Sequence, residues 1–236
     1  MSKRRTPVLA DGAENSTLSS SPTPPAEKSP STPARFASLA DKDYRLSKFL
    51  AICGSHSQRL PFHLSVLRYV CKLLEYSGHG VPWFILAIAK VSVAIRPDHI
   101  EFWSNMILAL SLELWTVAII KAIIRRPRPV YSPQVGTLPY NPDKYSFPSG
   151  HSSRAVMEAV LWCSAGFTGL TSKFLMVLWG ASVCLSRIIL GRHYFSDVCA
   201  GTVLGIFLGW VQLNIVWMDL PLCRWLLSPI HNTISM

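Results

Sequence analysis

Charged side chains are scarce in this sequence. Only 15% of its 236 residues are Asp, Glu, Lys or Arg, whereas roughly 25% is typical of soluble domains. Acidic residues are the scarcest, with 13 against 23 Lys and Arg, so the formal net charge is +10. Apolar residues reach 50%, and the mean hydropathy is +0.29. This composition argues against a soluble nucleic-acid-binding protein and favours a membrane protein whose basic groups meet anionic lipid headgroups or phosphorylated substrates.

The sequence also lacks the common metal and disulfide patterns. Its six cysteines include no CxxC pair, so buried free thiols are expected rather than a disulfide framework or a zinc site. It has no carboxylate-rich loop of the kind that holds Mg²⁺. We therefore predict no metal and no cofactor. No apolar stretch follows the basic start Lys3-Arg4-Arg5, so no cleavable signal peptide is predicted.

The N-terminal part of the chain divides into two regions. Residues 1–43 are rich in Ser, Thr and Pro, and are predicted to be a disordered tail. Four Ser-Pro and Thr-Pro pairs between Asn15 and Ala34 are either phosphorylation sites or plain linker chemistry. Residues 44–78 form an amphipathic interfacial helical region, with apolar side chains at helical spacing between Pro61 and Ser77. That helix is expected to lie in the membrane interface or to pack on the bundle.

Residues 79–236 form a membrane domain with five strongly apolar segments. A helix needs about 20 residues to cross roughly 30 Å of hydrocarbon, and three segments reach that length. The two shorter ones are extended by flanking residues, tilted or buried in the bundle. We predict an all-α fold, a multi-pass membrane helical bundle with about five spanning helices plus the amphipathic helix. Lys90 and Glu113, inside the apolar segments, are expected to pair with each other or to snorkel. The segments are Val81–Ile95, Trp103–Ile124, Val156–Leu170, Phe174–Leu190 and Val198–Met218.

Three polar clusters lie near the ends of these segments. The first runs from Lys121 to Pro129, the second is Pro148-Ser149-Gly150-His151, and the third runs from Ser186 to Asp197. Each alone has another explanation. Basic residues orient a span, a serine caps a helix, and a histidine and an aspartate four residues apart form a surface pair.

The three clusters are expected on one membrane face, because alternating spans return the chain to the same side. A clamp of basic side chains, a helix N-terminus with free N–H groups and two histidines would then converge. A 26-residue connection, residues 125–150, lies between two of the clusters, and loops of that length are usually functional. The convergence predicts a phosphoryl-transfer site.

The combined pattern K-x6-RP, PSGH and SR-x5-H-x3-D resembles the type 2 phosphatidic acid phosphatase superfamily, which includes lipid phosphatases, glucose-6-phosphatase and vanadium haloperoxidases. Every defining position from Lys121 to Asp197 is filled. Within this superfamily, three stretches resemble the polyisoprenoid diphosphate phosphatase branch, the presqualene diphosphate phosphatase relatives. They are residues 77–83, 143–151 and 190–193.

The resemblance implies roles for individual residues. His193 would attack phosphorus and form a phosphohistidine, and Asp197 would fix its tautomer and stabilise the imidazolium. His151 would protonate the leaving oxygen and then activate water. The remaining polar groups would hold the non-bridging phosphate oxygens in place of a metal ion. They are Lys121, Arg128, Ser149, Gly150 and Arg187.

The sequence thus predicts an enzyme, a metal-independent integral-membrane lipid phosphatase acting on polyisoprenoid diphosphates (presqualene, farnesyl, geranylgeranyl) and monophosphates. A phosphatidic acid or other glycerolipid phosphatase is the alternative; a catalytically inactive membrane scaffold would not need the intact histidines. Its expected partners are a lipid diphosphate substrate and membrane lipids, without nucleic acid, and the sequence indicates no oligomeric state. The predicted location is the endoplasmic reticulum membrane, with the nuclear envelope as an alternative. Five spans would place the active loops on the cytosolic side, whereas a spanning helix at Pro61 to Ser77 would place them on the lumenal side.

Overall fold

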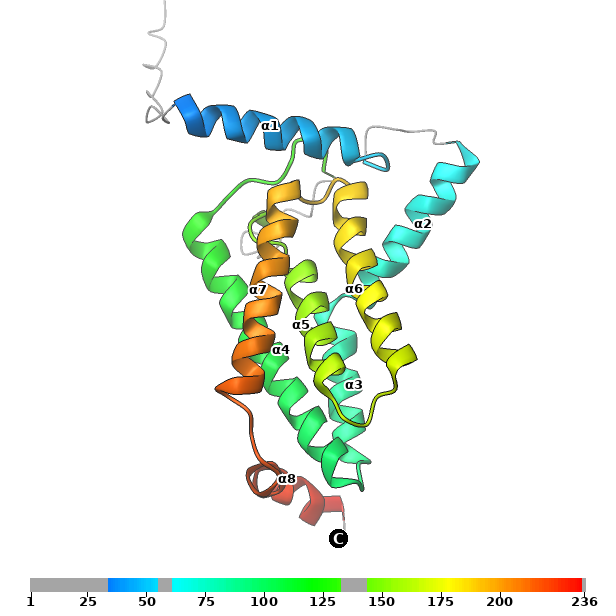
Figure 1. Cartoon of the computed structure of the whole chain (residues 1–236), viewed down its shortest axis with the longest axis vertical. Helices are drawn as coiled ribbons and strands as arrows, with labels where there is room; N and C mark the ends of the chain where they lie inside the picture. The colour runs from blue at the N-terminus through cyan, green and yellow to red at the C-terminus, as the bar shows by residue number, and fades with distance from the viewer. Residues whose placement is uncertain (1–33, 55–60, 133–143, 235–236) are drawn as a thin grey trace, which may run out of the picture.

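The computed structural model describes residues 34–54, 61–132 and 144–234, and over these ranges the chain is helical with no strand beyond an isolated bridge between Pro127 and Tyr145. Figure 1 shows a bundle of long helices with a further helix lying across each end. The prediction of an all-α membrane bundle is confirmed. The helices are α1 Ala34–Leu50, α2 Phe62–Ser77, α3 Gly80–Ser92, α4 Pro97–Ile124, α5 Gly150–Ser164, α6 Leu170–Ile189, α7 Phe195–Asn214 and α8 Leu220–Ile234.

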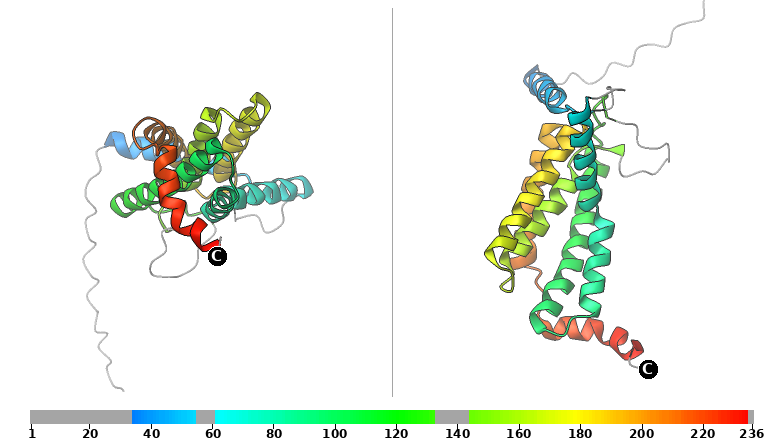
Figure 2. Two further views of the ribbon diagram at one scale, coloured as in Figure 1. Left: turned by 90° about the horizontal axis from the view of Figure 1, so that it is seen from below. Right: turned by 90° about the vertical axis from the view of Figure 1, so that its right-hand side faces the viewer.

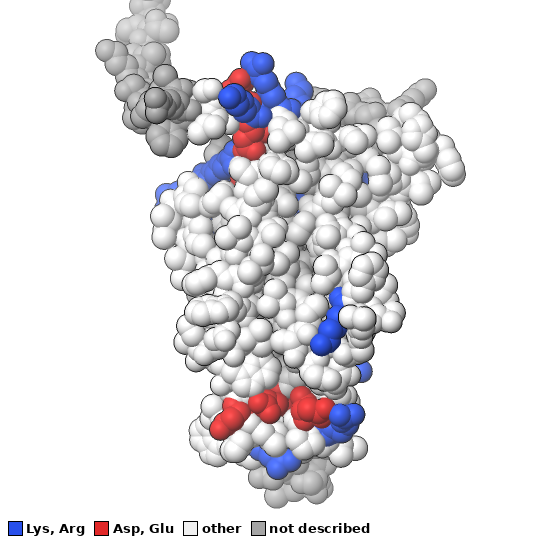
Figure 3. Space-filling model, viewed as in Figure 1, with Lys and Arg blue, Asp and Glu red and all other residues white. Residues whose placement is uncertain are grey.

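Three helices are long and apolar enough to cross a membrane in the described part of the chain. They are α4, α6 and α7, whereas α3 is apolar but has only 13 residues. The predicted number of about five spans therefore remains a prediction. On the face seen in Figure 3, charged residues gather toward the two ends and most of the surface between them is uncharged. This distribution suits a bundle surrounded by lipid.

Helix α5 lies inside the bundle, packed by α4, α6 and α7. Glycines let α7 approach it closely: a Cβ added at Gly201 would lie 2.5 Å from the backbone oxygen of Ser149, and one at Gly205 would overlap the backbone oxygen of Ser153. Small residues at such spacing allow helix backbones to approach in membranes. The Ser149 amide also donates a hydrogen bond to the Asp197 carbonyl at 3.0 Å. The start of α5 is thereby fixed against the start of α7.

A buried ion pair inside the bundle differs from the sequence prediction. Glu113 on α4 pairs with Arg154 on α5, with 2.7 Å between Oε2 and Nη2. Lys90, the partner proposed from the sequence, is exposed on α3. Arg154 was overlooked because it lies at the start of an apolar segment, whereas only an inward-facing position on α5 brings it to Glu113. The pair satisfies charges that would otherwise be costly inside the bundle.

The boundary of the predicted disordered tail was also wrong. Helix α1 begins at Ala34, inside the segment 1–43, and it lies across the end of the bundle where α7 begins (Figures 1 and 2). Its Ser47 hydroxyl accepts a hydrogen bond from the Phe195 amide at 2.8 Å, so tertiary contacts order a sequence whose composition alone does not. Residues 1–33, with the Ser-Pro and Thr-Pro pairs, lie outside the described residues. Helix α2 forms as predicted and packs against α6.

Candidate active site

The residues of the three sequence clusters come from one end of the bundle, where α4 and α6 end and α5 and α7 begin (Figure 1). Lys121 is in the last turn of α4 and Arg187 in the last turn of α6. Asp197 is in the first turn of α7. Arg128 lies in the connection after α4, and His193 in the short turn between α6 and α7. The three clusters therefore converge at one end of the bundle, as the alternation of spans predicts.

The start of α5 offers an anion-binding helix terminus. Ser149 is the N-cap: its hydroxyl accepts a hydrogen bond from the Ser152 amide at 3.4 Å and lies 2.9 Å from the Ser152 hydroxyl. Gly150 is the first residue of the helix. The first N–H groups of a helix lack intrahelical partners and carry the positive end of its dipole. A phosphate at this terminus is therefore favoured.

His193 is buried, with 2% of its surface exposed, and its tautomer is fixed by the backbone. Its Nδ1 donates a hydrogen bond to the Ser146 carbonyl at 2.8 Å, which leaves Nε2 with a lone pair. Burial lowers the pKa of His193 to about 4; Asp197 opposes this shift, and the charges of Arg128 and Lys121 add to it. The imidazole is consequently neutral near pH 7, as a nucleophile requires.

Asp197 was expected to fix the tautomer of His193, but it does not form the hydrogen bond that this role requires. Its Oδ2 is 3.7 Å from Nδ1 of His193, longer than a hydrogen bond. The carboxylate is instead bound by Arg126, with 2.6 Å between Nη1 and Oδ1, and by the Tyr194 amide at 3.0 Å. Its negative charge still lies beside the ring and can stabilise an imidazolium. A backbone acceptor such as the Ser146 carbonyl has no signature in the sequence.

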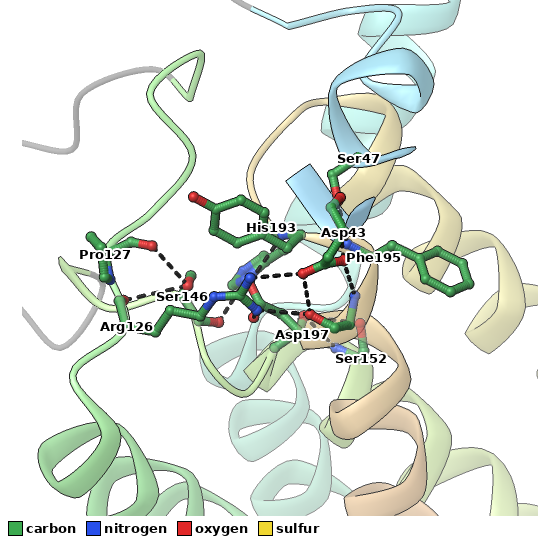
Figure 4. A network of polar contacts seen from close by, with 12 residues as sticks. Asp43, Ser47, Arg126, Pro127, Ser146, Ser152, His193, Phe195 and Asp197 are labelled. Atoms are coloured by element: carbon green, nitrogen blue, oxygen red, sulfur yellow. Dashed lines mark hydrogen bonds and ion pairs between the residues drawn. The ribbon is translucent and has the colours of Figure 1, made fainter. Parts of the chain in front are cut away.

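Arg126 links the site to helix α1 (Figure 4). Its Nη2 lies 2.7 Å from Oδ2 of Asp43, and its guanidinium stacks 3.9 Å from the centre of the Tyr194 ring. From its position near a span end, Arg126 is expected to serve as an interface charge or to hold a second phosphate, whereas in the structure it pairs with two carboxylates. Asp43 was not predicted, because it lies inside the segment expected to be a disordered tail.

Arg187 is 1% exposed, and its side chain forms an ion pair with a glutamate of helix α2. Its Nη1 lies 3.0 Å from Oε1 of Glu75, which is also 3.4 Å from Nε of Arg192. Among the described residues, Nε and Nη2 of Arg187 have no hydrogen-bond partner. Burial raises the pKa of Glu75, but the charge and hydrogen bond of Arg187 and the charges of Arg192 and Arg128 outweigh it and leave the pKa below its ordinary value. A free Nε and Nη2 edge matches two phosphate oxygens.

His151, the second residue of α5, is the last of the predicted site residues. Its Nε2 is buried and makes no hydrogen bond with a described residue, and its electrostatic neighbours include Arg187, Arg154 and His193. The His79 ring lies 6.0 Å from the His151 ring, centre to centre. His151 is thus placed to exchange a proton with a group bound near Arg187 and His193.

No group of three or more His, Cys, Asp or Glu side chains suited to a metal ion occurs in the described ranges. The site consists of cations, helix amides and two histidines, a donor set for phosphate oxygens. Together with the membrane bundle, it defines an integral-membrane phosphatase. The PAP2 superfamily model matches residues 102–221, and the chain belongs to this superfamily.

Curated relatives agree with the class. A probable lipid phosphate phosphatase beta of Arabidopsis thaliana is 31% identical over 163 residues, which cover 53% of this chain and 76% of the plant protein. The decaprenylphosphoryl-5-phosphoribose phosphatase of Mycobacterium tuberculosis H37Rv is 31% identical over 137 residues, or 58% of this chain and 73% of that protein. The chain is therefore related to phosphatases of lipid and of polyprenyl phosphates.

Two solved structures share the fold. Aquifex aeolicus LpxE has a TM-score of 0.53 and 26% identity, over 72% of this chain and 93% of its own. The transmembrane PAP2 phosphatidylglycerolphosphate phosphatase of Bacillus subtilis has a TM-score of 0.56 and 21% identity, over 75% and 85%. At 21% identity the second likeness concerns the fold alone.

Proposed function

We propose that this chain hydrolyses polyisoprenoid diphosphates and monophosphates at the membrane surface through a phosphohistidine on His193. The observation that carries the proposal is the state of His193: a buried, neutral imidazole whose Nδ1 is bound to a carbonyl, with the charges of Lys121 and Arg128 acting on it. A neutral imidazole among cations fits attack on an anionic phosphoryl group.

The reaction takes two displacements at phosphorus. The Nε2 lone pair of His193 forms an N–P bond while the P–O bond to the leaving group breaks, and the protonated form of His151 gives its proton to the departing oxygen. Water then attacks phosphorus, His151 takes a proton from it, and the N–P electron pair returns to His193. Inorganic phosphate leaves, and both histidines regain their starting states.

The surrounding groups stabilise the transition state. The free edge of Arg187, the side chains of Lys121 and Arg128, and the helix terminus at Ser149 and Gly150 supply donors for the three non-bridging oxygens. Donors fixed in place before the reaction lower the barrier more than mobile water does. The same groups are the reason for proposing turnover without a metal ion.

An isoprenoid tail suits the surroundings of the site. An apolar groove of about 680 Å³ runs between α5, α6 and α7, and its lining residues Ile188 and Val198 directly follow Arg187 and Asp197 in sequence. This volume lies in the range of about 300–1,000 Å³ that is usual for ligand sites. The related decaprenylphosphoryl-5-phosphoribose phosphatases act, by name, on a polyprenyl compound. Both observations support a prenyl substrate; we further propose the endoplasmic reticulum membrane as the location.

A glycerolipid phosphatase is the second candidate function. The similarity to the plant lipid phosphate phosphatase favours it, because the same phosphate site serves either tail. The two candidates differ only in what the apolar helices bind.

A substrate panel tests the proposal. Purified protein in lipid nanodiscs is given farnesyl diphosphate, farnesyl monophosphate and phosphatidic acid at equal surface concentration, with and without EDTA, and phosphate release is measured. We expect the farnesyl compounds to be hydrolysed with at least tenfold higher kcat/KM than phosphatidic acid, with EDTA having no effect. A preference for phosphatidic acid would select the second candidate, and loss of activity in EDTA would contradict metal-independent turnover.

A further inference from the structure

Helix α1 lies outside the part of the chain that matches the family, yet it contacts the start of α7 directly. The Asp43 carboxylate accepts hydrogen bonds from the Ser196 hydroxyl at 2.5 Å and the Ser196 amide at 3.1 Å, and Ser47 accepts one from the Phe195 amide. Side chains of α1 therefore cap two of the first amide groups of α7, the helix that carries Asp197 (Figure 4).

The contact with Arg126 gives Asp43 a second role. The guanidinium lies between two carboxylates, 2.7 Å from Asp43 and 2.6 Å from Asp197. Burial raises the pKa of Asp43, but the hydrogen bonds from Arg126 and Ser196 outweigh it and leave this pKa below its ordinary value. Asp43 is thus ionised at neutral pH, and the three groups together carry a charge of about −1. Without Asp43, Arg126 would neutralise Asp197 on its own.

We propose that Asp43 is a positioning residue for the reaction, which acts through Arg126 to keep the negative charge of Asp197 available to His193. The inference rests on the proposed function of His193 as the nucleophile. When Nε2 is phosphorylated, the ring becomes positively charged, and the charge remaining on the Asp43, Arg126 and Asp197 group stabilises it. Because α1 supplies that charge, the α1 helix is part of the catalytic unit and not only a surface attachment.

Few titratable or charged groups surround His193 and Asp43. Those acting on His193 come from α4, the connection after it, α5 and α7, and those around Asp43 come from α1, the same connection and the start of α7. They are Lys121, Arg128, His151 and Asp197 near His193, and Tyr44, Arg126, Tyr131, Tyr194, Asp197 and Cys199 near Asp43.

The test replaces Asp43 with its neutral isostere. D43N should lower kcat about tenfold with KM changed less than threefold, because the lost charge acts on the reacting histidine and not on substrate binding. The acidic limb of the pH profile should shift to lower pH, since removing a negative charge lowers the pKa of His193. The assay uses phosphate release from farnesyl monophosphate in nanodiscs.

Matched variants separate the charge from the packing of α1. D41N changes an exposed aspartate on the same helix that pairs only with Arg45 among the described residues, and it should behave as wild type. S47A removes the cap on Phe195 without changing charge, so it should lower the melting temperature without moving the pH limb. In an R126Q background, D43N should add no further loss of kcat.

Three results would overturn the inference: kcat and pH profile of D43N equal to wild type, a pH limb moved equally by S47A, or a full additional loss in the R126Q background. Wild-type protein without any turnover of the lipid panel would overturn the proposed function instead. The two failures are therefore distinguishable.

Discussion

The helices inside the family match and the helices outside it contribute different chemistry to the site. Helices α4 to α7, with their connections, provide the two histidines, Asp197, the amides of α5 and the cations proposed to bind a phosphoryl group. Helices α1 and α2 provide carboxylates: Asp43 holds Arg126, and Glu75 holds Arg187. The family match thus contains the groups proposed to touch phosphate, whereas Asp43 and Glu75, which help to orient two of the arginines, lie outside it.

The largest loss of activity is expected from a change inside the family match, at His193. His193→Ala should lower kcat by roughly 10³-fold or more, because it removes the proposed nucleophile and no other described histidine shares its carbonyl contact. Phosphate release measures the loss, and thermal unfolding in nanodiscs shows whether the bundle is intact. His63→Ala, an exposed histidine on α2, is the control and should keep full activity. A residual rate near wild type would show that the reaction does not use His193.

A smaller effect is expected from helix α2. Glu75→Gln keeps the shape of the side chain but removes the charge that fixes Nη1 of Arg187, so the free edge should be less well oriented and kcat/KM should fall about tenfold. Asp98→Asn breaks an exposed ion pair with Arg96 at the other end of α4 and should change little. An increase in kcat/KM for Glu75→Gln would mean that Glu75 competes with phosphate for Arg187.

The smallest expected effect is on the pH dependence of kcat/KM, to which His193 should contribute nothing near neutral pH. Because the pKa of His193 is lowered to about 4 from its ordinary 6.5, protonation of this ring should not reduce kcat/KM between pH 7 and 5.5, after correction for substrate ionisation. The unfolded chain, however, takes up a proton at this histidine near pH 6.5. The free energy of unfolding should therefore decrease as pH falls from 6.5 toward 4, and less so in His193→Gln. A free energy of unfolding whose pH dependence between 6.5 and 4 is the same in wild type and His193→Gln would contradict the assigned state.

The sequence predicts which polar clusters share one end of the bundle, but not which residues of other helices orient them. Lys121, His151 and Asp197 were predictable together because alternating apolar segments determine which ends share a face. Asp43 and Glu75 were not, since a single acidic residue in a Ser-rich flank or on an amphipathic helix carries no pattern. Its partner is decided by how α1 and α2 pack, and that packing depends on contacts far apart in sequence. The Asp197 to His193 pairing failed for a similar reason: spacing of four residues brings two side chains near, but a competing arginine and a backbone carbonyl decide the hydrogen bonds.

Direct detection of the covalent intermediate tests the central claim. His151→Ala protein is mixed with farnesyl diphosphate labelled with ³²P at the terminal phosphorus; the monophosphate leaving group needs little protonation, so the intermediate should form and then persist without its base. After an alkaline quench, we predict an acid-labile label on the peptide that contains His193, and none when His193 is also replaced by Ala. Label on another residue, or label that survives replacement of His193, would contradict the account.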